Sequence, residues 1–539
     1  MSTRIALRAD ASPSMGTGHF MRILVVADAL RARGGETVLL SRSLPDRLRA
    51  RAEKAGHTAV DLPLPPEGRA QPQTDGYDQD LDAALCMEAL EKAGGVERLV
   101  VDHYELSAHF ETTLRPYVPW IAAIDDLADR AHDCDVLLDQ GLYPDAENRY
   151  ARLVPETCAS LLGPRYSLLR EEFGAVRGSG ERRDGLVHEI LVFLGGGDTR
   201  GMTLRALEAI RSLIGKGLHV TVVTTSDEPD LQRLQSVCGR MSSVTLRVDV
   251  ENMAELMSQA DLSVGAGGTA TWERCYLGLP TVFASFADNQ SGVAREVAAA
   301  GAGIDLGARP PSEVIGAALR GLLDDPERVG EMGHAATMMM AGARVGRRHE
   351  LAMRVISGHD RYLLRPVGPP DMGLLYTWRN SDRIRAASLS DHPISISEHR
   401  RWFLETLGSD LRLYYVFEID GQPVGVFHLD RQSRSAESAA WGFYVGAESV
   451  PPGAGTAMCR RGLHEAFVVE GLQRVHAEVL AGNERSLSLH ERLGFKRTGT
   501  RVSQGADGPR QVVGLVLDQD TWKAVTVVPG MGSGVEDRT

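Results

Sequence analysis

The sequence predicts an α/β protein with two doubly wound, Rossmann-type units in tandem, followed by a separate mixed α/β domain. At 539 residues the chain far exceeds the roughly 250–300 residues at which one hydrophobic core stops growing. In the first two-thirds, short apolar runs alternate with segments of helical period, and the alternation restarts after a glycine-rich, charged interruption. Strands that alternate with helices form parallel sheets, which bind ligands at the carboxyl ends of their strands.

The first unit is expected over residues 1–176. Apolar runs predict its strands at residues 5–10, 37–41, 98–104, 121–126 and 135–140. Between the first two, "HFMRILVVADALRARG" predicts a helix, because its apolar residues recur at three- and four-residue steps and glycines follow it. Three strands end near an aspartate that would face the ligand, and the sequence does not rank these residues, which are Asp10, Asp102 and Asp125.

The opening motif "MGTGHFMR" places Gly18 and His19 between the first strand and its helix. Glycine lets a substrate approach the backbone, and the helix N-terminus offers N–H groups and partial positive charge to an anion. The same field disfavours a charged imidazole, so His19 is expected to be neutral and able to act as a general base for water. The alternative is a histidine that only caps the helix or is hydrogen-bonded in the core.

The second unit is expected over residues 186–358, after the linker "VRGSGERRDG" at 176–185. Its predicted strands are the apolar runs at 189–198, 219–225, 244–248, 260–268 and 280–285. The helical stretch 325–356 is expected to close this unit, with its methionine run in the core.

A glycine turn in the second unit, "SVGAGGTATWERCYLGLPTVFASFADNQ" (263–290), predicts a nucleotide site. Gly267, Gly268 and Thr269 would begin a helix and hold a diphosphate through backbone N–H groups and a hydroxyl. Glu273, one turn later, would reach the hydroxyls of a ribose. The alternative is an ordinary strand–helix turn with a solvated glutamate.

These motifs carry a family resemblance. With "FLGGGD" (193–198), the glycine segment resembles the carboxyl-terminal half of GT-B-type sugar-nucleotide enzymes, whose second unit holds UDP. With "RADASPSMGTGHFMR", "VDHYEL", "IDDLADR" and "YSLLREEF", about the first 355 residues resemble the UDP-2,4-diacetamido-2,4,6-trideoxy-β-L-altropyranose hydrolases of pseudaminic acid biosynthesis. The first two units are accordingly expected to form a GT-B-like pair.

The resemblance implies hydrolysis of the anomeric bond of a UDP-sugar with inversion, with His19 as catalytic base and Asp10 as a second catalytic residue. It assigns binding of the UDP-sugar to Gly18, Arg22, Gly196, Gly268, Thr269, Glu273, Asn289 and Gln290. Many members have a glycine directly after the aspartate, whereas Ala11 follows Asp10 here, so the shape of that loop stays open. No metal-ligand cluster is visible in the sequence, and a metal-independent reaction is expected.

Residues 360–522 carry a second resemblance. Two strand-like runs at 412–431 flank the hairpin signal "DG", and a glycine loop before a helix follows in "VGAESVPPGAGTAMCRRGLHEAF". With "AEVLAGNERSLSLHERLGFKRTG", these features resemble the GNAT acetyltransferase superfamily. The resemblance implies that acetyl-CoA, as co-substrate, is held by Gly453, Gly455, Thr456, Asn483 and Ser486.

Two positions depart from that superfamily. Val450 stands where Gln or Arg is usual, so that Arg460 or Arg461 would supply the missing charge. His490 stands where a tyrosine often protonates the departing thiolate. It would do the same if protonated or would only hydrogen-bond the sulfur, and the alternative is a surface residue of a helix. The segment 378–403 would shape the acceptor pocket, where none of the polar candidates stands out as a base; these are His392, Glu398 and Glu437.

Composition excludes several classes of partner. The net charge of −13 predicts no general binding to nucleic acid or to an anionic membrane. Without a signal-peptide h-region or a run of about 18 apolar residues, and with six scattered cysteines that predict reduced thiols, the chain is expected to be cytoplasmic. A disordered tail is expected at 526–539, and the oligomeric state stays open.

Together the two resemblances predict a bifunctional enzyme of pseudaminic acid biosynthesis. The last domain would 4-N-acetylate a UDP-4-amino-4,6-dideoxy-N-acetyl-L-altrosamine, and the GT-B-like pair would hydrolyse the product to UDP and free sugar. The alternative is a GT-B glycosyltransferase with a regulatory acetyl-CoA-binding domain. A related legionaminic-type sugar and direct passage of the intermediate between sites stay open.

Overall fold

The computed structural model describes residues 3–11, 17–42, 44–63, 78–177, 185–195, 201–213, 217–285, 288–505 and 508–526. The chain divides into two compact units, Met1–Gly358 and His359–Thr539. Two parallel sheets form the first unit and one mixed sheet forms the second, which confirms the predicted fold class. Gly196 and the predicted tail beyond residue 526 lie outside the described residues.

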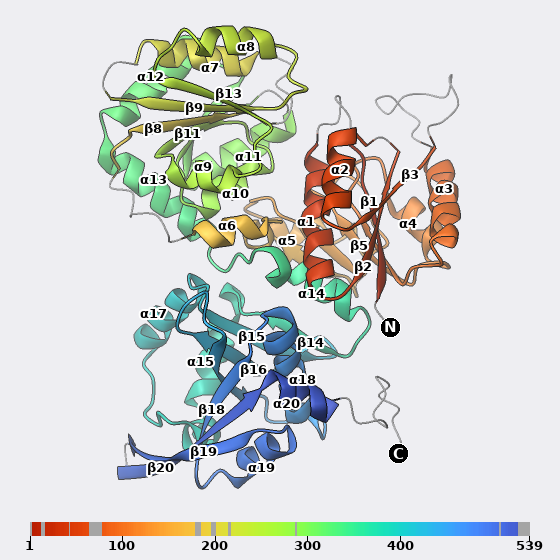
Figure 1. Ribbon diagram of the computed structural model, residues 1–539, viewed down its shortest axis with the longest axis vertical. Helices are drawn as coiled ribbons and strands as arrows, with labels where there is room; N and C mark the ends of the chain where they lie inside the picture. The colour runs from red at the N-terminus through yellow and green to blue at the C-terminus, as the bar shows by residue number, and fades with distance from the viewer. Residues whose placement is uncertain are drawn as a thin grey trace. The chain divides into compact units, whose positions relative to one another are not determined.

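The first half of unit 1 is a seven-stranded parallel sheet in the order β3-β2-β1-β4-β5-β6-β7. Helices cover both faces, with α1 and α2 on one and α3 and α4 on the other (Figure 1). The elements are β1 (Arg4–Arg8), α1 (Gly18–Ala32), β2 (Glu36–Ser41), α2 (Asp46–Lys54), β3 (Thr58–Asp61), α3 (Gln79–Lys92), β4 (Arg98–Val101), α4 (Ala108–Leu114), β5 (Trp120–Ile124), β6 (Val136–Asp139), α5 (Ala146–Arg149), β7 (Ala159–Leu162) and α6 (Glu171–Val176). The strand order reverses between β1 and β4, so a ligand is expected at their carboxyl ends.

The second half is a six-stranded parallel sheet in the order β10-β9-β8-β11-β12-β13. In Figure 1, α7, α8 and α12 cover one face and α9, α10 and α11 the other. The elements are β8 (Glu189–Phe193), α7 (Met202–Arg211), β9 (His219–Thr224), α8 (Leu231–Cys238), β10 (Val244–Val248), α9 (Met253–Gln259), β11 (Leu262–Gly265), α10 (Ala270–Tyr276), β12 (Thr281–Ser285), α11 (Asp288–Ala299), β13 (Gly303–Ala308), α12 (Ser312–Leu323), α13 (Pro326–Met339) and α14 (Glu350–Ser357).

The expectation that residues 325–356 close the second half is wrong for their last part. Glycines with positive φ at 342 and 346 interrupt the helical stretch, which becomes α13 and α14. Leu351, Ala352 and Val355 of α14 lie in the same core as α1, in the first half. Conversely, Phe173 of α6 lies in the core of the second half. Each half is therefore completed by a helix that follows the last strand of the other half in the sequence.

The second unit is a seven-stranded sheet in the order β14-β15-β16-β17-β18-β20-β19. It contains the predicted hairpin, whose strands β15 and β16 pair antiparallel around Asp420-Gly421. Strand β17 pairs parallel with β18 only from Ser438 to Ala440, although both strands continue further. The elements are β14 (Tyr362–Pro366), α15 (Met372–Asn380), α16 (Asp382–Ala387), α17 (Ile396–Leu407), β15 (Arg412–Ile419), β16 (Gln422–Arg431), β17 (Ser438–Val445), α18 (Ala454–His464), a π-helix (Glu465–Val469), β18 (Arg474–Leu480), α19 (Glu484–Arg492), β19 (Lys496–Gly505), β20 (Gly508–Asp518) and α20 (Gln519–Thr526).

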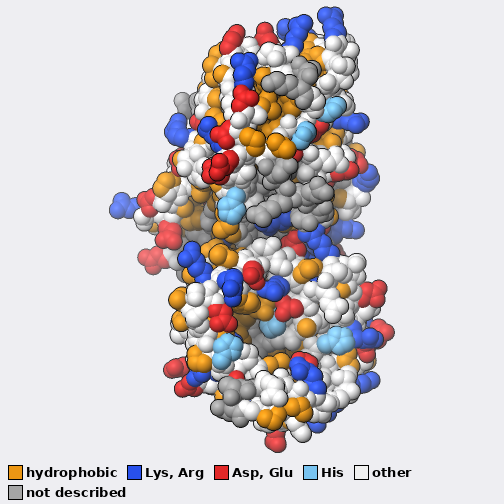
Figure 2. Space-filling view, turned by 90° about the vertical axis from the view of Figure 1, so that its left-hand side faces the viewer, with side chains coloured by type: hydrophobic (Ala, Val, Ile, Leu, Met, Phe, Trp, Pro, Cys, Tyr) orange, Lys and Arg blue, Asp and Glu red, His pale blue; other side chains and the backbone are white. Residues whose placement is uncertain are grey.

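The surface charge, the apolarity of the helices and the state of the cysteines can be compared with the predictions made from composition. On the face drawn in Figure 2, the coloured Lys and Arg side chains are intermixed with Asp and Glu rather than gathered by sign. Among the described residues, no helix combines the length and apolarity that a membrane crossing needs. All six cysteines are free thiols, and five of them are buried.

Candidate active sites

His19 lies at the predicted ligand edge of the first sheet, where α1 begins. Its Nδ1 is 2.6 Å from Oδ1 of Asp102, the residue directly after β4. Arg22, one turn further along α1, donates from Nε and Nη2 to the same carboxylate at 2.8 and 2.7 Å. All three side chains are buried, and the Tyr104 ring meets the imidazole edge-on with centroids 4.3 Å apart. Of the three unranked aspartates, Asp102 is therefore the partner of the histidine.

The contacts define which nitrogen of His19 carries the proton. The Asp102 carboxylate can only accept, so at 2.6 Å the Nδ1–H of His19 donates to it. In the neutral imidazole the other nitrogen, Nε2, then has a lone pair and can accept a proton. Burial alone would raise the pKa of Asp102, but Arg22 and His19 more than offset this and hold it below its ordinary value. The carboxylate therefore stays charged and orients the imidazole.

Asp10 occupies a separate buried cluster. Its carboxylate accepts from Arg8 Nη2 at 2.9 Å, from the backbone N–H of Arg42 at 2.7 Å and from Ser41. His103 Nε2 lies 3.2 Å from Oδ2. Burial opposes the charged form, but Arg8 and His103 hold the pKa of Asp10 well below its usual range. These contacts anchor the end of β1, and a catalytic role for Asp10 stays a prediction.

Asp125 and Asp139 form a third polar group beside this edge. The Tyr150 hydroxyl lies 3.0 Å from a carboxylate oxygen of each residue and has one proton to donate. Arg130 pairs with Asp125. Burial alone would raise the pKa of Asp125, but the charge of Arg130 and the N–H of Ala128 more than offset this and hold it below its ordinary value. Burial raises the pKa of Asp139 to about 6, despite the N–H of Gly141 and Arg149. Asp139 therefore keeps a proton to higher pH than an ordinary carboxyl does.

Asp139→Asn is expected to stabilise the chain at high pH only. The pKa of Asp139 is higher in the folded chain than in the unfolded chain. The stability that this carboxyl contributes is therefore complete below the unfolded-state pKa and is lost as the pH rises through about 6. Because asparagine stays neutral, we expect the free energy of unfolding at pH 8 to rise by on the order of 2 kcal/mol, with no gain near pH 4. Urea unfolding at both pH values measures this. Asp129→Asn, at an exposed aspartate, is the control, and an equal gain at pH 4 would contradict the assignment.

The glycine turn after β11 lies against the start of α11. A Cβ at Gly267 would lie 2.0 Å from the backbone oxygen of Gln290, so only glycine fits there. A Cβ at Gly18 would lie 3.5 Å from Thr269 Oγ1, which places the opening motif beside this turn. The structure thus brings together residues predicted from separate motifs. Gly268 has open space around its Cα, and of Asn289 only the backbone is described.

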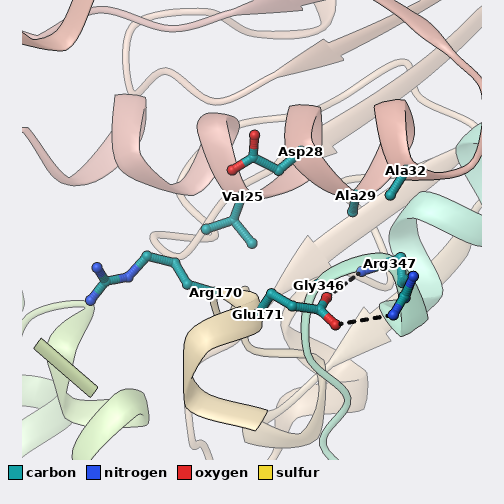
Figure 3. A pocket seen from close by; sticks show the side chains of 8 residues that line it. All are labelled: Val25, Asp28, Ala29, Ala32, Arg170, Glu171, Gly346 and Arg347. Carbon is teal, nitrogen blue, oxygen red and sulfur yellow. Dashed lines mark hydrogen bonds and ion pairs between the residues drawn. The ribbon is translucent and has the colours of Figure 1, made fainter. Parts of the chain in front are cut away.

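Glu273 pairs with Arg170, a contact that the sequence did not predict. Its Oε1 accepts from Arg170 Nε at 3.1 Å, and Arg170 also pairs with Glu172. Arg170 lines a cavity of about 350 Å³ between α1 and the chain around α6 and Gly346 (Figure 3). In Figure 3 its guanidinium points away from Glu171 and Arg347, which contact each other. His19 does not line this cavity, so the cavity and the histidine site are distinct features.

Three residues of the first site were missed as individuals although their motifs were noted. Tyr104 lies in "VDHYEL", Asp126 in "IDDLADR" and Arg170 in "YSLLREEF". Asp126 accepts from Arg22 Nη1 at 2.8 Å. For Tyr104 and Asp126 the available signal was a position within two residues of a strand-end aspartate, whereas Arg170 has no such neighbour. Among the described residues, no group of three or more His, Cys, Asp or Glu side chains is arranged to hold a metal ion.

In the second unit, the predicted acetyl-CoA residues lie around two helix starts. Gly453 has a left-handed conformation and open space at its Cα, and α18 begins directly after it without a side-chain cap. The N–H of Ala454 donates to the backbone oxygen of Pro451, so the N–H groups that follow it in the first turn of α18 are the ones that can bind phosphate oxygens. Asn483 caps α19 by accepting from the N–H of Ser486 at 3.2 Å. Beyond Ala440, β17 and β18 no longer pair with each other, so the backbone edges of the two strands are not joined there.

His490 is not placed as a proton donor, which corrects the prediction. It is buried, its Nδ1 donates to the backbone oxygen of Ser486 at 2.8 Å, and its Nε2 accepts from Trp441 Nε1 at 3.0 Å. Burial lowers the pKa of His490, so the imidazole is neutral and both nitrogens are in use. His490 therefore packs in the core beneath α19. It is neither placed to give a proton to the thiolate nor a surface residue of the helix.

Other candidates of this unit are also accounted for. Arg461 pairs with Asp360, so it is not free to supply charge to the phosphates, whereas Arg460 is exposed. His392 and Glu398 lie 3.5 Å apart and are half exposed, and Glu437 is exposed before β17. None of these three has the buried, oriented setting of His19.

Comparisons with known proteins agree with this architecture. Residues 190–344 match the glycosyltransferase family 28 C-terminal domain, and residues 361–496 match the acetyltransferase (GNAT) domain. The chain is 27% identical over 259 residues to the UDP-2,4-diacetamido-2,4,6-trideoxy-beta-L-altropyranose hydrolase of Campylobacter jejuni, covering 48% of this chain and 82% of the relative. It is 21% identical over 520 residues to an uncharacterized protein of Methanocaldococcus jannaschii, covering 92% and 97%.

Among solved structures, the spermidine N-acetyltransferase from Vibrio cholerae in complex with CoA and spermine aligns with a TM-score of 0.29 and 18% identity, over 31% of this chain and 99% of its own. The sequence comparisons confirm both predicted resemblances: to the altropyranose hydrolases in the GT-B-like pair and to GNAT acetyltransferases in the last domain.

Proposed function

We propose that this chain, which joins a GT-B-like pair to a GNAT domain, catalyses two consecutive steps on one UDP-sugar. The GNAT domain transfers the acetyl group of acetyl-CoA to the 4-amine of UDP-4-amino-4,6-dideoxy-N-acetyl-β-L-altrosamine. The GT-B-like pair then hydrolyses the resulting UDP-2,4-diacetamido-2,4,6-trideoxy-β-L-altropyranose to UDP and free sugar. The observation that carries the hydrolase is the His19–Asp102 pair, which leaves Nε2 of His19 as a proton acceptor.

In the hydrolysis, Nε2 of His19 takes a proton from water as the water oxygen bonds to the anomeric carbon. The bond from that carbon to the diphosphate oxygen breaks, and UDP leaves with the electron pair. UDP is already a good leaving group, so positioning of the diphosphate and the water supplies most of the remaining catalysis. The turn at Gly268 and Thr269 is the proposed diphosphate site, and Gly18 lies next to it.

A glycosyltransferase is the second candidate, because the matched C-terminal domain is described as that of glycosyltransferase family 28. Such an enzyme would pass the sugar to an acceptor other than water. The buried histidine with an oriented, unprotonated nitrogen favours water activation, and an experiment without any acceptor separates the two candidates.

The test is an NMR time course of the purified chain with the UDP-4-amino sugar, with and without acetyl-CoA. We expect UDP and the free diacetamido sugar to form only when acetyl-CoA is present. Acetylation without release of UDP would contradict the hydrolase and favour a glycosyltransferase. Release of UDP without acetyl-CoA would contradict the proposed order of the two steps.

Glu273→Gln is expected to raise KM for the UDP-sugar about tenfold with little change in kcat, because one charge-assisted hydrogen bond to the bound ribose is weakened. Steady-state kinetics of UDP release measure this. Glu172→Gln is the matched control, since Glu172 also pairs with Arg170 but lies in α6, away from the glycine turn. An equal rise in KM for both variants would show that Arg170, rather than contact with the nucleotide, is responsible.

A further inference from the structure

His428 lies on an interior strand of the GNAT sheet in a row of facing residues. Strand register pairs it with Tyr414 of β15 on one side and with Gly442 of β17 on the other. Its neighbours in sequence, Phe427 and Leu429, are fully buried on the opposite face, where Phe427 meets α18 at Gly462. His428 therefore faces the side of the sheet covered by α15 and α17. This is the side on which residues 378–403 were predicted to shape the acceptor pocket.

The surroundings of His428 orient its ring. The imidazole stacks on Tyr414, with centroids 4.6 Å apart and planes at 6°. Its Nδ1 lies 3.5 Å from Oδ2 of Asp430, two residues along the same strand. The side chain is 25% exposed although its strand is third of seven, so one edge of the ring remains accessible. Burial, followed by the charge of Asp430, raises the pKa of Tyr414, which excludes the phenol as a base near neutral pH.

The other ring nitrogen of His428 lies directly over β17. A Cβ on Gly442 would be 2.3 Å from Nε2, so the absence of a side chain at 442 makes room for the imidazole. Gly442 is two residues beyond Ala440, the last residue of β17 that pairs with β18. The row of Tyr414, His428 and Gly442 thus ends at the point where the sheet opens. A ring nitrogen that can accept a proton is therefore placed beside the stretch of β17 that no longer pairs with β18.

We propose that His428, held by stacking on Tyr414 and lying near the Asp430 carboxylate, is the general base for acetyl transfer, an assignment that rests on the proposed acetyltransferase function. Nε2 takes a proton from the attacking amino nitrogen of the acceptor. The bond between that nitrogen and the acetyl carbon forms, and the carbon–sulfur bond of acetyl-CoA breaks. Coenzyme A leaves as a thiolate, which takes a proton from solvent because His490 has no free nitrogen to give one.

The test measures release of coenzyme A thiol by the full chain, with acetyl-CoA and the UDP-4-amino sugar. For His428→Ala and His428→Gln we expect kcat at least about 100-fold lower, with KM for acetyl-CoA within about twofold of wild type. Added imidazole should restore part of the activity of His428→Ala but not of His428→Gln, whose side chain still fills the site. His476→Ala, at an exposed histidine of β18, is the matched control and should keep full activity.

Three results would overturn the assignment. One is an unchanged kcat in His428→Ala, and another is loss in His392→Ala in its place. The third is parallel loss of turnover and of coenzyme A affinity by calorimetry in both His428 variants, which would show a structural role. If wild type itself binds coenzyme A without acetylating the amino sugar, the proposed function fails and the base assignment falls with it. That outcome is distinguishable, because wild type rather than the variant is then inactive.

Discussion

His19→Ala is expected to lower kcat for UDP release by about 10²–10⁴, the usual contribution of a positioned general base. The reason is that Nε2 of His19 is the proposed proton acceptor for water, with Asp102 holding the ring through Nδ1. Acetyl transfer by the same preparation should be unchanged, because its proposed residues lie in the other compact unit. Both rates can be read from one NMR experiment, by following UDP and the acetylated sugar.

Unchanged acetyl transfer in the same preparation would show that the variant is folded. His19→Gln, whose side chain is closer in size to histidine, is a second variant. Equal loss of acetyl transfer and hydrolysis in both variants would count against two separate sites. Retention of rapid UDP release would show that His19 only completes the core at the start of α1, which is the alternative that its burial leaves open.

Asp102→Asn is expected to affect both catalysis and stability. An asparagine amide can donate as well as accept a hydrogen bond, so it no longer enforces the Nδ1–H tautomer, and we expect kcat for UDP release to fall about 10³–10⁴-fold, as in other oriented histidines. The substitution also leaves the buried Arg22 guanidinium without its main counter-charge. Removing one partner of a buried ion pair costs about 3–5 kcal/mol, so the midpoint of urea unfolding should fall as well.

Asp126→Asn is the matched control. Asp126 pairs with the same arginine through Nη1, but its carboxylate is 26% exposed and does not contact His19 in any described interaction. We expect a loss below about 1 kcal/mol and a rate within a few-fold of wild type. If Asp102→Asn kept a normal rate while losing stability, the carboxylate would be a structural partner of Arg22 only.

Much of the fold follows from hydrophobic period. Each predicted strand of the two parallel sheets is present within a few residues, and the hairpin around Asp420-Gly421 has the predicted pairing. The short strands β3, β7 and β13 were missed, because four to six residues with mixed burial leave little periodic signal. The destination of α14 was also not predictable, since an amphipathic pattern shows which face is apolar but not which sheet it covers.

For the sites, too, the sequence predicted where residues lie in the fold but not which side chains they contact. Sequence placed Asp10, Asp102 and Asp125 at one edge of a sheet, but only side-chain geometry separates the partner of His19 from the two that have other partners. His490 was placed on the correct helix, and its orientation toward Trp441 was not visible in a one-dimensional pattern. His428 was not predicted, because a single histidine in an apolar strand has the pattern of a core residue. Only the structure shows that it lies against Gly442 of the neighbouring strand.

The exchange of helices within unit 1 limits how this protein could have been assembled. Leu351, Ala352 and Val355 cover apolar surface of α1 that residues 1–176 alone would leave bare, and Phe173 does the same for the second half. A gene recombined between the two parallel sheets would encode two fragments with exposed cores. The viable crossover lies after Gly358, where the contacts divide. Fusion of the two units would therefore proceed end to end, with residues 1–358 inherited whole.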